Sequence, residues 1–310
     1  MNPRRPETSF RRDGNASPGW TLALVSDSFR PMRRWLAILL CLLPAVASRG
    51  APARDAVALT IATANLSDNV TQAYGDPGIR ILQALHPDVL AIQEFNYKLG
   101  TSKDLAQQLF GPDAHFAREK GGARLPNGVI SRYPIVAFGQ WEDPYVANRS
   151  LFWATVRIPG PKPLHVVSVH LVQNRAERRL PEARYLLELI RQKFPEGDYV
   201  ALCGDFNVDS RESKALAELT KWFDDSAQPV DQNGNPNTNA ARNRPYDYVL
   251  PNPALAPHHV ATKLGGQKFP DGLVFDSRLW NPLPPPAEWE DTARDLQHLP
   301  VMKTFRIPVR

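Results

Sequence analysis

The amino-acid sequence predicts an α/β (α+β) fold, a four-layer sandwich in which two packed mixed β-sheets are flanked by helices. Three observations support this prediction. Short apolar runs of strand length recur along the chain, and segments with helical spacing of apolar residues lie between them. Several of the runs end on a polar residue, and no Pro- or Gly-rich linker separates two self-sufficient halves. Short strands with interspersed helices favour sheets that pack face to face, with the helices outside.

The first elements follow from local patterns. Alternating apolar residues indicate a strand over 57–64, which brings Asn65 to its end. Asp76-Pro77 is typical of a helix start, because Asp can cap the first turn and Pro fits inside it. The next segment, 89–94, begins with four apolar residues and indicates a second strand that ends on the carboxylate of Glu94. Two strands therefore present polar groups at their tips.

The later elements repeat this pattern. Pro181 is expected to open a helix that runs to Phe194, since Pro is tolerated in a first helical turn. The others are expected, in chain order, as a helix at 104–110, strands at 129–130, 151–158, 164–170 and 199–203, a helix at 213–223, and strands at 246–250 and 299–307. Long loops are expected at 226–244 and 280–292.

The chain begins with a segment typical of protein export. From Met32 it contains two arginines, an apolar run of about nine residues and the small residues Ala45 and Ala47, as in a cleaved secretory signal. The run is far shorter than the roughly 20 residues of a membrane span. We therefore expect a leader at 1–47, with Met32 as an alternative start, and one domain at 48–310. This organisation predicts a secreted or periplasmic bacterial protein.

The net charge of +5 does not by itself indicate nucleic-acid binding. Residues 1–47 hold seven of the 37 basic residues and three of the 32 acidic ones, so the rest of the chain carries only +1. A nucleic-acid site would need a local basic patch. Candidates for a groove that follows phosphates are Arg118, Lys120, Arg124, Arg132 and Arg149. A second cluster fits a solvated helix face better than a phosphate site; it comprises Arg175, Arg178, Arg179 and Arg184.

Seven polar residues stand at or beside the ends of predicted strands: Asn65, Glu94, His170, Asp205, Asn207, Asp247 and His298. Any one of them alone would fit a turn, a surface or a core, but seven at comparable positions indicate one site. Hard divalent cations take oxygen ligands, and Mg²⁺ is usually held by one or two carboxylates. Glu94, helped by Asn65, is the natural ligand for Mg²⁺, with Mn²⁺ or Ca²⁺ as alternatives.

The remaining polar residues suit the cleavage of a phosphate ester. Asp205 can position a water for in-line attack, while His170, His298 and Asn207 can donate hydrogen bonds to the phosphate. Asp247 can hold a histidine in the required tautomer. No G-x-S-x-G elbow, P-loop, G-x-G-x-x-G turn or H-E-x-x-H pair offers a competing chemistry.

The order of the motifs resembles the endonuclease/exonuclease/phosphatase superfamily, the deoxyribonuclease-I-like proteins. The resemblance covers about residues 56–307 and rests on Asn65, Gln93-Glu94, Gly128–Ile135, Ser168–Leu171, Gly204–Asn207, Tyr246–Val249 and His298–Val301. It implies a two-sheet sandwich and a Mg²⁺-dependent phosphoesterase. It also implies a role for each matched residue: Glu94 as the metal-binding glutamate, Asn65 as its supporting asparagine, His170 and His298 as the two active-site histidines, Asp205 and Asn207 as the pair that positions water and phosphate, and Asp247 as the partner of His298.

One departure from the family pattern concerns the metal. Where the family ends in Ser-Asp-His, this chain has Leu296-Gln297-His298. Gln297 keeps an oxygen ligand for the metal but loses the charge, which should weaken cation binding or restrict the site to one ion. Asp295 would restore the charge if the segment is extended, since residues two apart share a face.

The fold does not choose among the family's substrates. Export favours substrates met outside the cytoplasm, namely environmental DNA or RNA, phospholipid headgroups or small phosphoesters. Among these, we expect first a phosphodiesterase that acts on nucleic acid. A phospholipase or sphingomyelinase-like enzyme, or a small-molecule phosphatase, is the alternative. A third hypothesis is a binding domain that has lost catalytic activity because of Gln297. No stable protein partner is implied, and we expect a monomer.

Overall fold

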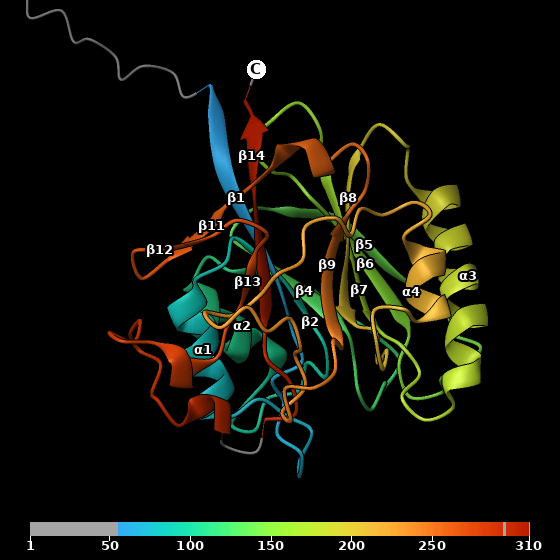
Figure 1. Ribbon diagram of the computed structural model, residues 1–310. Helices are drawn as coiled ribbons and strands as arrows, with labels where there is room; N and C mark the ends of the chain where they lie inside the picture. The colour runs from blue at the N-terminus through green and yellow to red at the C-terminus, as the bar shows by residue number, and fades with distance from the viewer. Residues whose placement is uncertain (1–54, 294–295, 310) are drawn as a thin grey trace, which may run out of the picture. The chain divides into compact units, whose positions relative to one another are not determined.

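The computed structural model describes residues 55–293 and 296–309 (Figure 1). The predicted leader at 1–47 and Asp295 lie outside the described residues, so the expectations attached to them stay predictions. Within the described ranges, none of the helices combines the length and the apolar character needed to cross a membrane.

Two large mixed sheets form the centre of the fold. The first has seven strands, in the order β10-β14-β1-β2-β4-β3 with β13 also paired to β14. The second has five strands in the order β5-β6-β7-β8-β9. Parallel pairing joins β1 to β2 and β7 to β8, and the other pairs are antiparallel.

The strands have the following bounds. The first sheet contains β1 (Ala56–Ala64), β2 (Val89–Ile92), β3 (His115–Arg118), β4 (Gly128–Ser131), β10 (His259–Val260), β13 (Leu273–Val274) and β14 (Val301–Pro308). The second contains β5 (Ile135–Trp141), β6 (Leu151–Val156), β7 (Leu164–His170), β8 (Tyr199–Asp205) and β9 (Asp247–Pro251), and a separate hairpin pairs β11 (Thr262–Leu264) with β12 (Gln267–Phe269).

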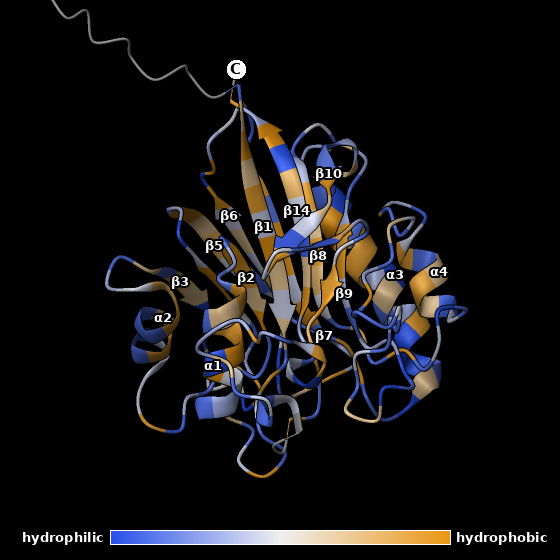
Figure 2. Cartoon of the chain, turned by 60° about the vertical axis from the view of Figure 1, so that its left-hand side comes forward, coloured by the Kyte–Doolittle hydropathy of each residue, from blue (hydrophilic) through white to orange (hydrophobic). Residues whose placement is uncertain are grey.

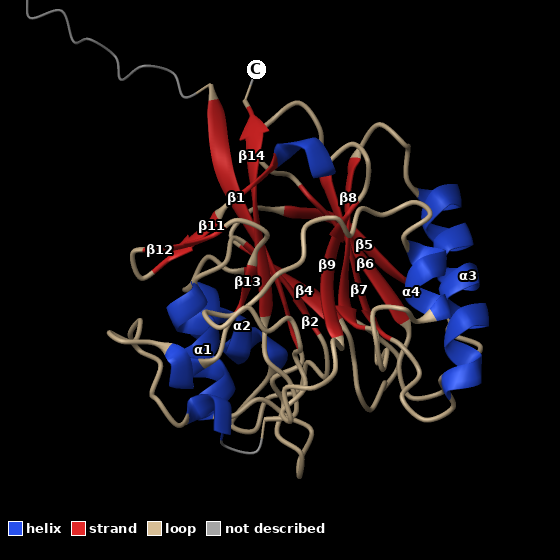
Figure 3. Ribbon diagram, in the orientation of Figure 1, coloured by secondary structure: helices blue, strands red, loops and turns tan. Residues whose placement is uncertain are grey.

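Helices cover the outer face of each sheet (Figure 3). Apolar side chains of α1 (Asp76–Leu85) and α2 (Ser102–Phe110) pack on the first sheet, and those of α3 (Ala176–Lys193) and α4 (Lys214–Leu219) pack on the second. A third apolar cluster lies between the sheets, where Leu59 and Ile61 of β1 face the second sheet. The hydrophobic colour is accordingly concentrated in the strands, while most loops are hydrophilic (Figure 2). The predicted four-layer sandwich is confirmed.

Some boundaries differ from the prediction. Pro181 does not open its helix: α3 begins at Ala176, and Pro181 lies in the second turn. A proline there removes one helical N–H, the donor to the carbonyl of residue 177, and the helix nevertheless continues to Lys193. The prediction also missed β3 and β5. β5 is an edge strand with mostly exposed or half-exposed side chains, so it lacks the apolar run by which strands are recognised.

The C-terminal third contains short irregular elements. The predicted loop at 226–244 carries no helix or strand, and the one at 280–292 reaches into a 3₁₀ turn. The 3₁₀ turns are η1 (Ala256–His258), η2 (Ser277–Leu279) and η3 (Asp291–Ala293).

Candidate active site

The predicted polar residues converge at one end of the sandwich. His170 is the register partner of Asp205 across β7 and β8, and Asp205 is the partner of Asp247 across β8 and β9. Opposite residues on paired strands share a face, so the three side chains form a row. Asn65 follows β1, and His298 precedes β14, the antiparallel neighbour of β1. The two sheets therefore contribute to one site.

Asp205 lies at the centre of this site and is 1% exposed. Its Oδ2 atom is 3.2 Å from Asn65 Nδ2, 3.3 Å from His170 Nε2 and 3.4 Å from His298 Nε2. Its Oδ1 atom accepts a hydrogen bond of 2.9 Å from the backbone N–H of Asn207. Burial raises the pKa of Asp205, and the nearby His298 opposes this rise. The carboxylate is therefore a stronger proton acceptor than an ordinary aspartate.

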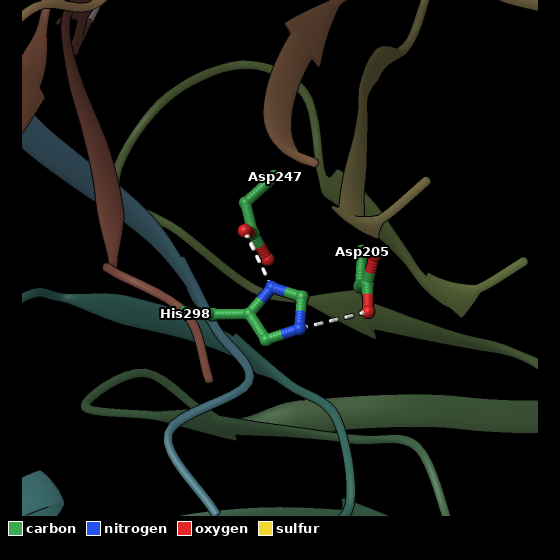
Figure 4. Close-up of side chains that lie close together, drawn as sticks. All are labelled: Asp205, Asp247 and His298. Carbon is green, nitrogen blue, oxygen red and sulfur yellow. Dashed lines mark hydrogen bonds and ion pairs between the residues drawn. The ribbon is translucent and has the colours of Figure 1, made fainter. Parts of the chain in front are cut away.

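His298 lies between two carboxylates (Figure 4). Its Nδ1 atom is 2.9 Å from Asp247 Oδ2, which also accepts a hydrogen bond of 2.7 Å from Thr238 Oγ1. Its Nε2 atom faces Asp205. Burial lowers the pKa of His298, but Asp247 and Asp205 outweigh burial and bring the pKa to about 9. His298 is therefore a cation at neutral pH, held in orientation by Asp247.

His170 has the opposite electrostatic character. Burial, Arg149 and the charged His298 all lower the pKa of His170 well below the ordinary histidine value. Its Nδ1 atom lies 3.8 Å from Glu94 Oε1 and has no hydrogen-bond partner in the described part of the chain. The site thus places a neutral imidazole and an imidazolium against the same carboxylate oxygen.

Glu94 and Asn65 offer oxygen atoms that fit a divalent cation. Glu94 is 3% exposed, and its Oε2 atom accepts a hydrogen bond of 2.5 Å from Ser67 Oγ. The buried Oδ1 atom of Asn65 has no partner among residues 55–293 and 296–309. An unpaired buried oxygen beside a buried carboxylate is costly unless a cation or water satisfies it. The residues present therefore fit the oxygen-only coordination of Mg²⁺.

Backbone geometry supports the assignment of Glu94 and Asn207 to the site. Both adopt left-handed conformations, with φ of 51° and 50° respectively. Such conformations are uncommon for residues with a side chain, and they concentrate at functional sites.

A second group of possible ligands is satisfied internally. One ligand atom from each of Asp205, Asp247 and His298 lies within 4.8 Å of the other two. These atoms already form the ion pairs that join His298 to the two carboxylates. Glu94 and Asn65 are therefore the better metal ligands.

The site opens into a pocket of about 440 Å³. Asn65, Glu94, His170, Asp205 and His298 line it, as does the partly exposed Gln297. Its other lining residues are Gln72, Arg124, Leu125, Tyr145, Val146, Ala147, Asn148, Arg149, Val172, Gln173 and Asn174. Asn207 and Asp247 lie behind this surface, and Asn207 Nδ2 donates a hydrogen bond of 3.0 Å to the carbonyl of Leu171.

The basic groove suggested by the sequence is largely absent from this pocket. Arg118 binds Phe95 O and Asn96 Oδ1. Arg132 binds Pro87 O. Neither lines the pocket, nor does Lys120. Only Arg124 and Arg149 of the proposed groove do so. The second cluster is not a uniformly solvated face either, because Arg179 is 8% exposed.

Sequence reasoning missed several residues that support the site. Ser67 binds Glu94, and Thr238 binds Asp247, yet both belong to segments without periodic pattern. Gln93 also joins the two sheets, because its Nε2 atom donates a 3.0 Å hydrogen bond to Ser168 Oγ of β7. Only the Gln93-Glu94 pair carried a signal in the sequence.

Comparisons with known proteins show the family and the fold of the chain. The model of the "Endonuclease/Exonuclease/phosphatase family" matches residues 73–267, more than half of the chain. A comparison of this chain with curated proteins found no match.

Solved structures with a similar fold come from several organisms. An endonuclease/exonuclease/phosphatase from Bacteroides vulgatus is 15% identical, with a TM-score of 0.55 over 81% of this chain and 99% of that chain. One from Beutenbergia cavernae is 19% identical, with a TM-score of 0.54 over 81% of this chain and 72% of that chain. An AP endonuclease from Archaeoglobus fulgidus is 16% identical, with a TM-score of 0.50 over 80% and 99%. At these identities the similarity shows the fold.

Proposed function

The chain belongs to the endonuclease/exonuclease/phosphatase family, whose members hydrolyse phosphoester bonds with a divalent metal, and we propose that it is an exported phosphodiesterase that cleaves nucleic acid. The observation that carries this proposal is the environment of Asp205. One buried carboxylate oxygen faces Asn65, His170 and His298 at the floor of a pocket that also contains Glu94. A proton acceptor, a fixed cation and free oxygen ligands are the groups that phosphoester hydrolysis needs.

Glu94 and Asn65 would hold the metal ion, with Mg²⁺ as the first candidate and Mn²⁺ or Ca²⁺ as alternatives. When bound, the ion supplies positive charge to phosphate oxygens and orients the ester. Gln297 lines the same pocket and would add a neutral ligand.

The side chains of the chain perform the proton and charge steps. Asp205 accepts a proton from the attacking water, and its raised pKa suits this role. As the bond from this water to phosphorus forms, the ester P–O bond breaks, and the leaving oxygen takes its proton from solvent. The imidazolium of His298 stabilises negative charge on the phosphate, while Asp247 and Thr238 fix its ring. Neutral His170 orients the water or the ester by hydrogen bonding. One N–H of the Asn207 amide binds Leu171 O and thereby braces the floor of the site.

Nucleic acid and export are proposed on separate grounds. The exposed Arg124 brings positive charge to the pocket wall, where a phosphate backbone would lie. The signal-like segment that ends near Ala47 supports a secreted or periplasmic enzyme. We propose that it acts as a monomer.

A lipid phosphodiesterase is the second candidate, because of two exposed aliphatic residues. Val70 and Leu99 are 84% and 74% exposed. They lie on the loops that follow β1 and β2, and the ion pair of Lys98 with Asp68 joins these loops at 2.5 Å. The loop after β1 projects from the end of the sandwich that holds the site (Figure 1). Exposed apolar side chains beside a phosphoesterase pocket suit contact with a lipid surface.

The experiment is hydrolysis of supercoiled plasmid and of phosphatidylcholine vesicles by the full chain, with Mg²⁺ or with EDTA. Nicking that requires both the metal and His170, tested with His170→Ala, is the expected result. Headgroup release without nicking would replace nucleic acid by lipid. If folded protein hydrolyses no phosphodiester, the proposal is wrong and a silent binding domain is favoured.

A further inference from the structure

The backbone immediately after His170 is held in an unusual way. This segment, residues 170–173, leaves β7 and enters the pocket wall, where Val172, Gln173 and Asn174 line the cavity. Its four successive carbonyls all accept hydrogen bonds from guanidinium groups. The donors are the arginines that the sequence suggested for a phosphate groove and for a solvated helix face.

Arg149 holds the first half of the segment. It precedes β6 and is 8% exposed. Its Nε atom donates to His170 O at 2.5 Å, and its Nη2 atom donates to Leu171 O at 2.9 Å. Its Nη1 atom is bound to Asn148 Oδ1 at 3.0 Å. The guanidinium therefore meets the backbone of the histidine that contacts Asp205.

Arg179 holds the second half from α3. Its Nε atom donates to Val172 O at 3.0 Å, and its Nη2 atom donates to Gln173 O at 2.8 Å. Its Nη1 atom forms a 2.7 Å ion pair with Asp209. On the same helix, both carboxyl oxygens of Glu182 accept from the N–H of Val172, at 2.9 and 3.1 Å.

Burial of the two guanidinium groups costs desolvation free energy. This cost would be unnecessary if the segment only connected β7 to α3. The planar guanidinium offers donors in a fixed fork, and it fixes two neighbouring carbonyls in a way that a lysine cannot reproduce. The side chains of Gln173 and Asn174 form no hydrogen bond with any other described residue and are exposed in the pocket. A rigid backbone thus presents free amide groups to whatever occupies the cavity.

We propose that Arg149 and Arg179 are positioning residues with separate tasks, a proposal that rests on the phosphodiesterase function above. Arg149 sets the orientation of His170 against Asp205. Arg179 sets the wall from which Gln173 and Asn174 contact the bound substrate. Fixing reactive and binding groups before substrate arrives lowers the cost of both steps.

The two tasks predict different kinetic losses. Arg149→Lys should lower kcat by about ten- to a hundredfold and leave KM nearly unchanged, as expected for a lost supporting contact. Arg179→Lys should mainly raise KM, by about three- to tenfold for a lost substrate hydrogen bond. Asn174→Ala should raise KM similarly, and the double variant Arg179→Lys/Asn174→Ala should raise it no further. Equal effects of both arginine variants on kcat and KM would overturn the division of tasks.

Arg80→Lys is the matched control, because Arg80 binds the buried Asp291 through Nε at 3.1 and 3.2 Å and does not line the pocket. It should lower the melting temperature without changing kcat or KM. If Arg179→Lys fails to fold, Asp209→Asn loosens the same guanidinium from a half-exposed partner.

A second readout does not depend on turnover. Hydrogen exchange of a peptide that spans residues 171–174 should become faster in Arg149→Lys and Arg179→Lys, and it should be unchanged in Arg80→Lys. Unchanged exchange would overturn the proposal even if activity falls. If the wild-type chain hydrolyses no ester, the phosphodiesterase function is wrong. Hydrogen exchange alone then decides whether Arg149 and Arg179 hold the backbone of residues 170–173.

Discussion

The replacement of Glu182 by glutamine tests how the titration of this buried carboxyl group makes the free energy of unfolding depend on pH. Glu182 is fully buried on α3, and burial, followed by the neighbouring Asp143, raises its pKa from 4.5 to about 9. The carboxyl group is therefore protonated in the folded chain at neutral pH and ionised in the unfolded chain. Because the folded-state pKa is raised, its contribution to stability is complete below pH 4.5 and is lost as the pH rises toward 9.

The size of this loss follows from the width of the window. Each pH unit inside it lowers the free energy of unfolding by about 1.4 kcal/mol, so the interval from pH 5 to pH 8 corresponds to about 4 kcal/mol. Glu182→Gln removes the titration but keeps an oxygen to accept from Val172 N and adds a donor toward Asp143. The variant should match wild type near pH 5 and exceed its stability at pH 8.

The assay is urea unfolding of wild type and Glu182→Gln at pH 5, 6.5 and 8. Glu188→Gln, at an exposed position of the same helix, is the control and should not change the pH dependence. A stability difference that is independent of pH, or a variant less stable than wild type at pH 8, would refute the reasoning.

Three further predictions concern the candidate active site and strand β8. Asp205→Asn should lower kcat by about 10²- to 10⁴-fold with an unchanged circular dichroism spectrum, since it removes the proton acceptor; a loss below tenfold would exclude that role. Glu94→Gln should raise the Mg²⁺ concentration for half-maximal activity by about tenfold or more, and Gln297→Asp should lower it; a metal titration in which neither variant shifts would remove both from the ligand set. Gly204→Ala should abolish soluble expression, because Gly204 has φ of 146° and an added Cβ would lie 1.9 Å from Val169 O. Gly197→Ala, whose Cβ would meet no atom within 4 Å, should express normally, and equal yields would contradict the account.

The sequence predicted the centre of the site because strand ends converge by topology. His170, Asp205 and Asp247 each end or begin a buried strand, and the register sets them side by side. An apolar run that ends on a polar residue indicates a buried strand with a polar side chain at its end, and only a few neighbouring residues are needed to recognise it. The two-sheet architecture followed from the same runs.

The supporting contacts could not be predicted in this way. Arg149 binds main-chain carbonyls 21 and 22 residues away, and Arg179 binds main-chain carbonyls seven and six residues away. A carbonyl has no side-chain identity, so it leaves no trace in the amino-acid pattern. Sequence alone therefore suggested phosphate binding for Arg149 and a solvated face for Arg179. Thr238 illustrates the same limit, since its partner Asp247 lies across an irregular loop.

The most direct test of the central claim is turnover of bis(p-nitrophenyl) phosphate by the full chain, measured against Mg²⁺ concentration for wild type, His170→Ala and Asp205→Asn. The account predicts saturable, EDTA-sensitive hydrolysis by wild type and a loss of about 10²-fold or more in both variants. Hydrolysis that persists in EDTA, or that survives both substitutions in folded protein, would contradict it.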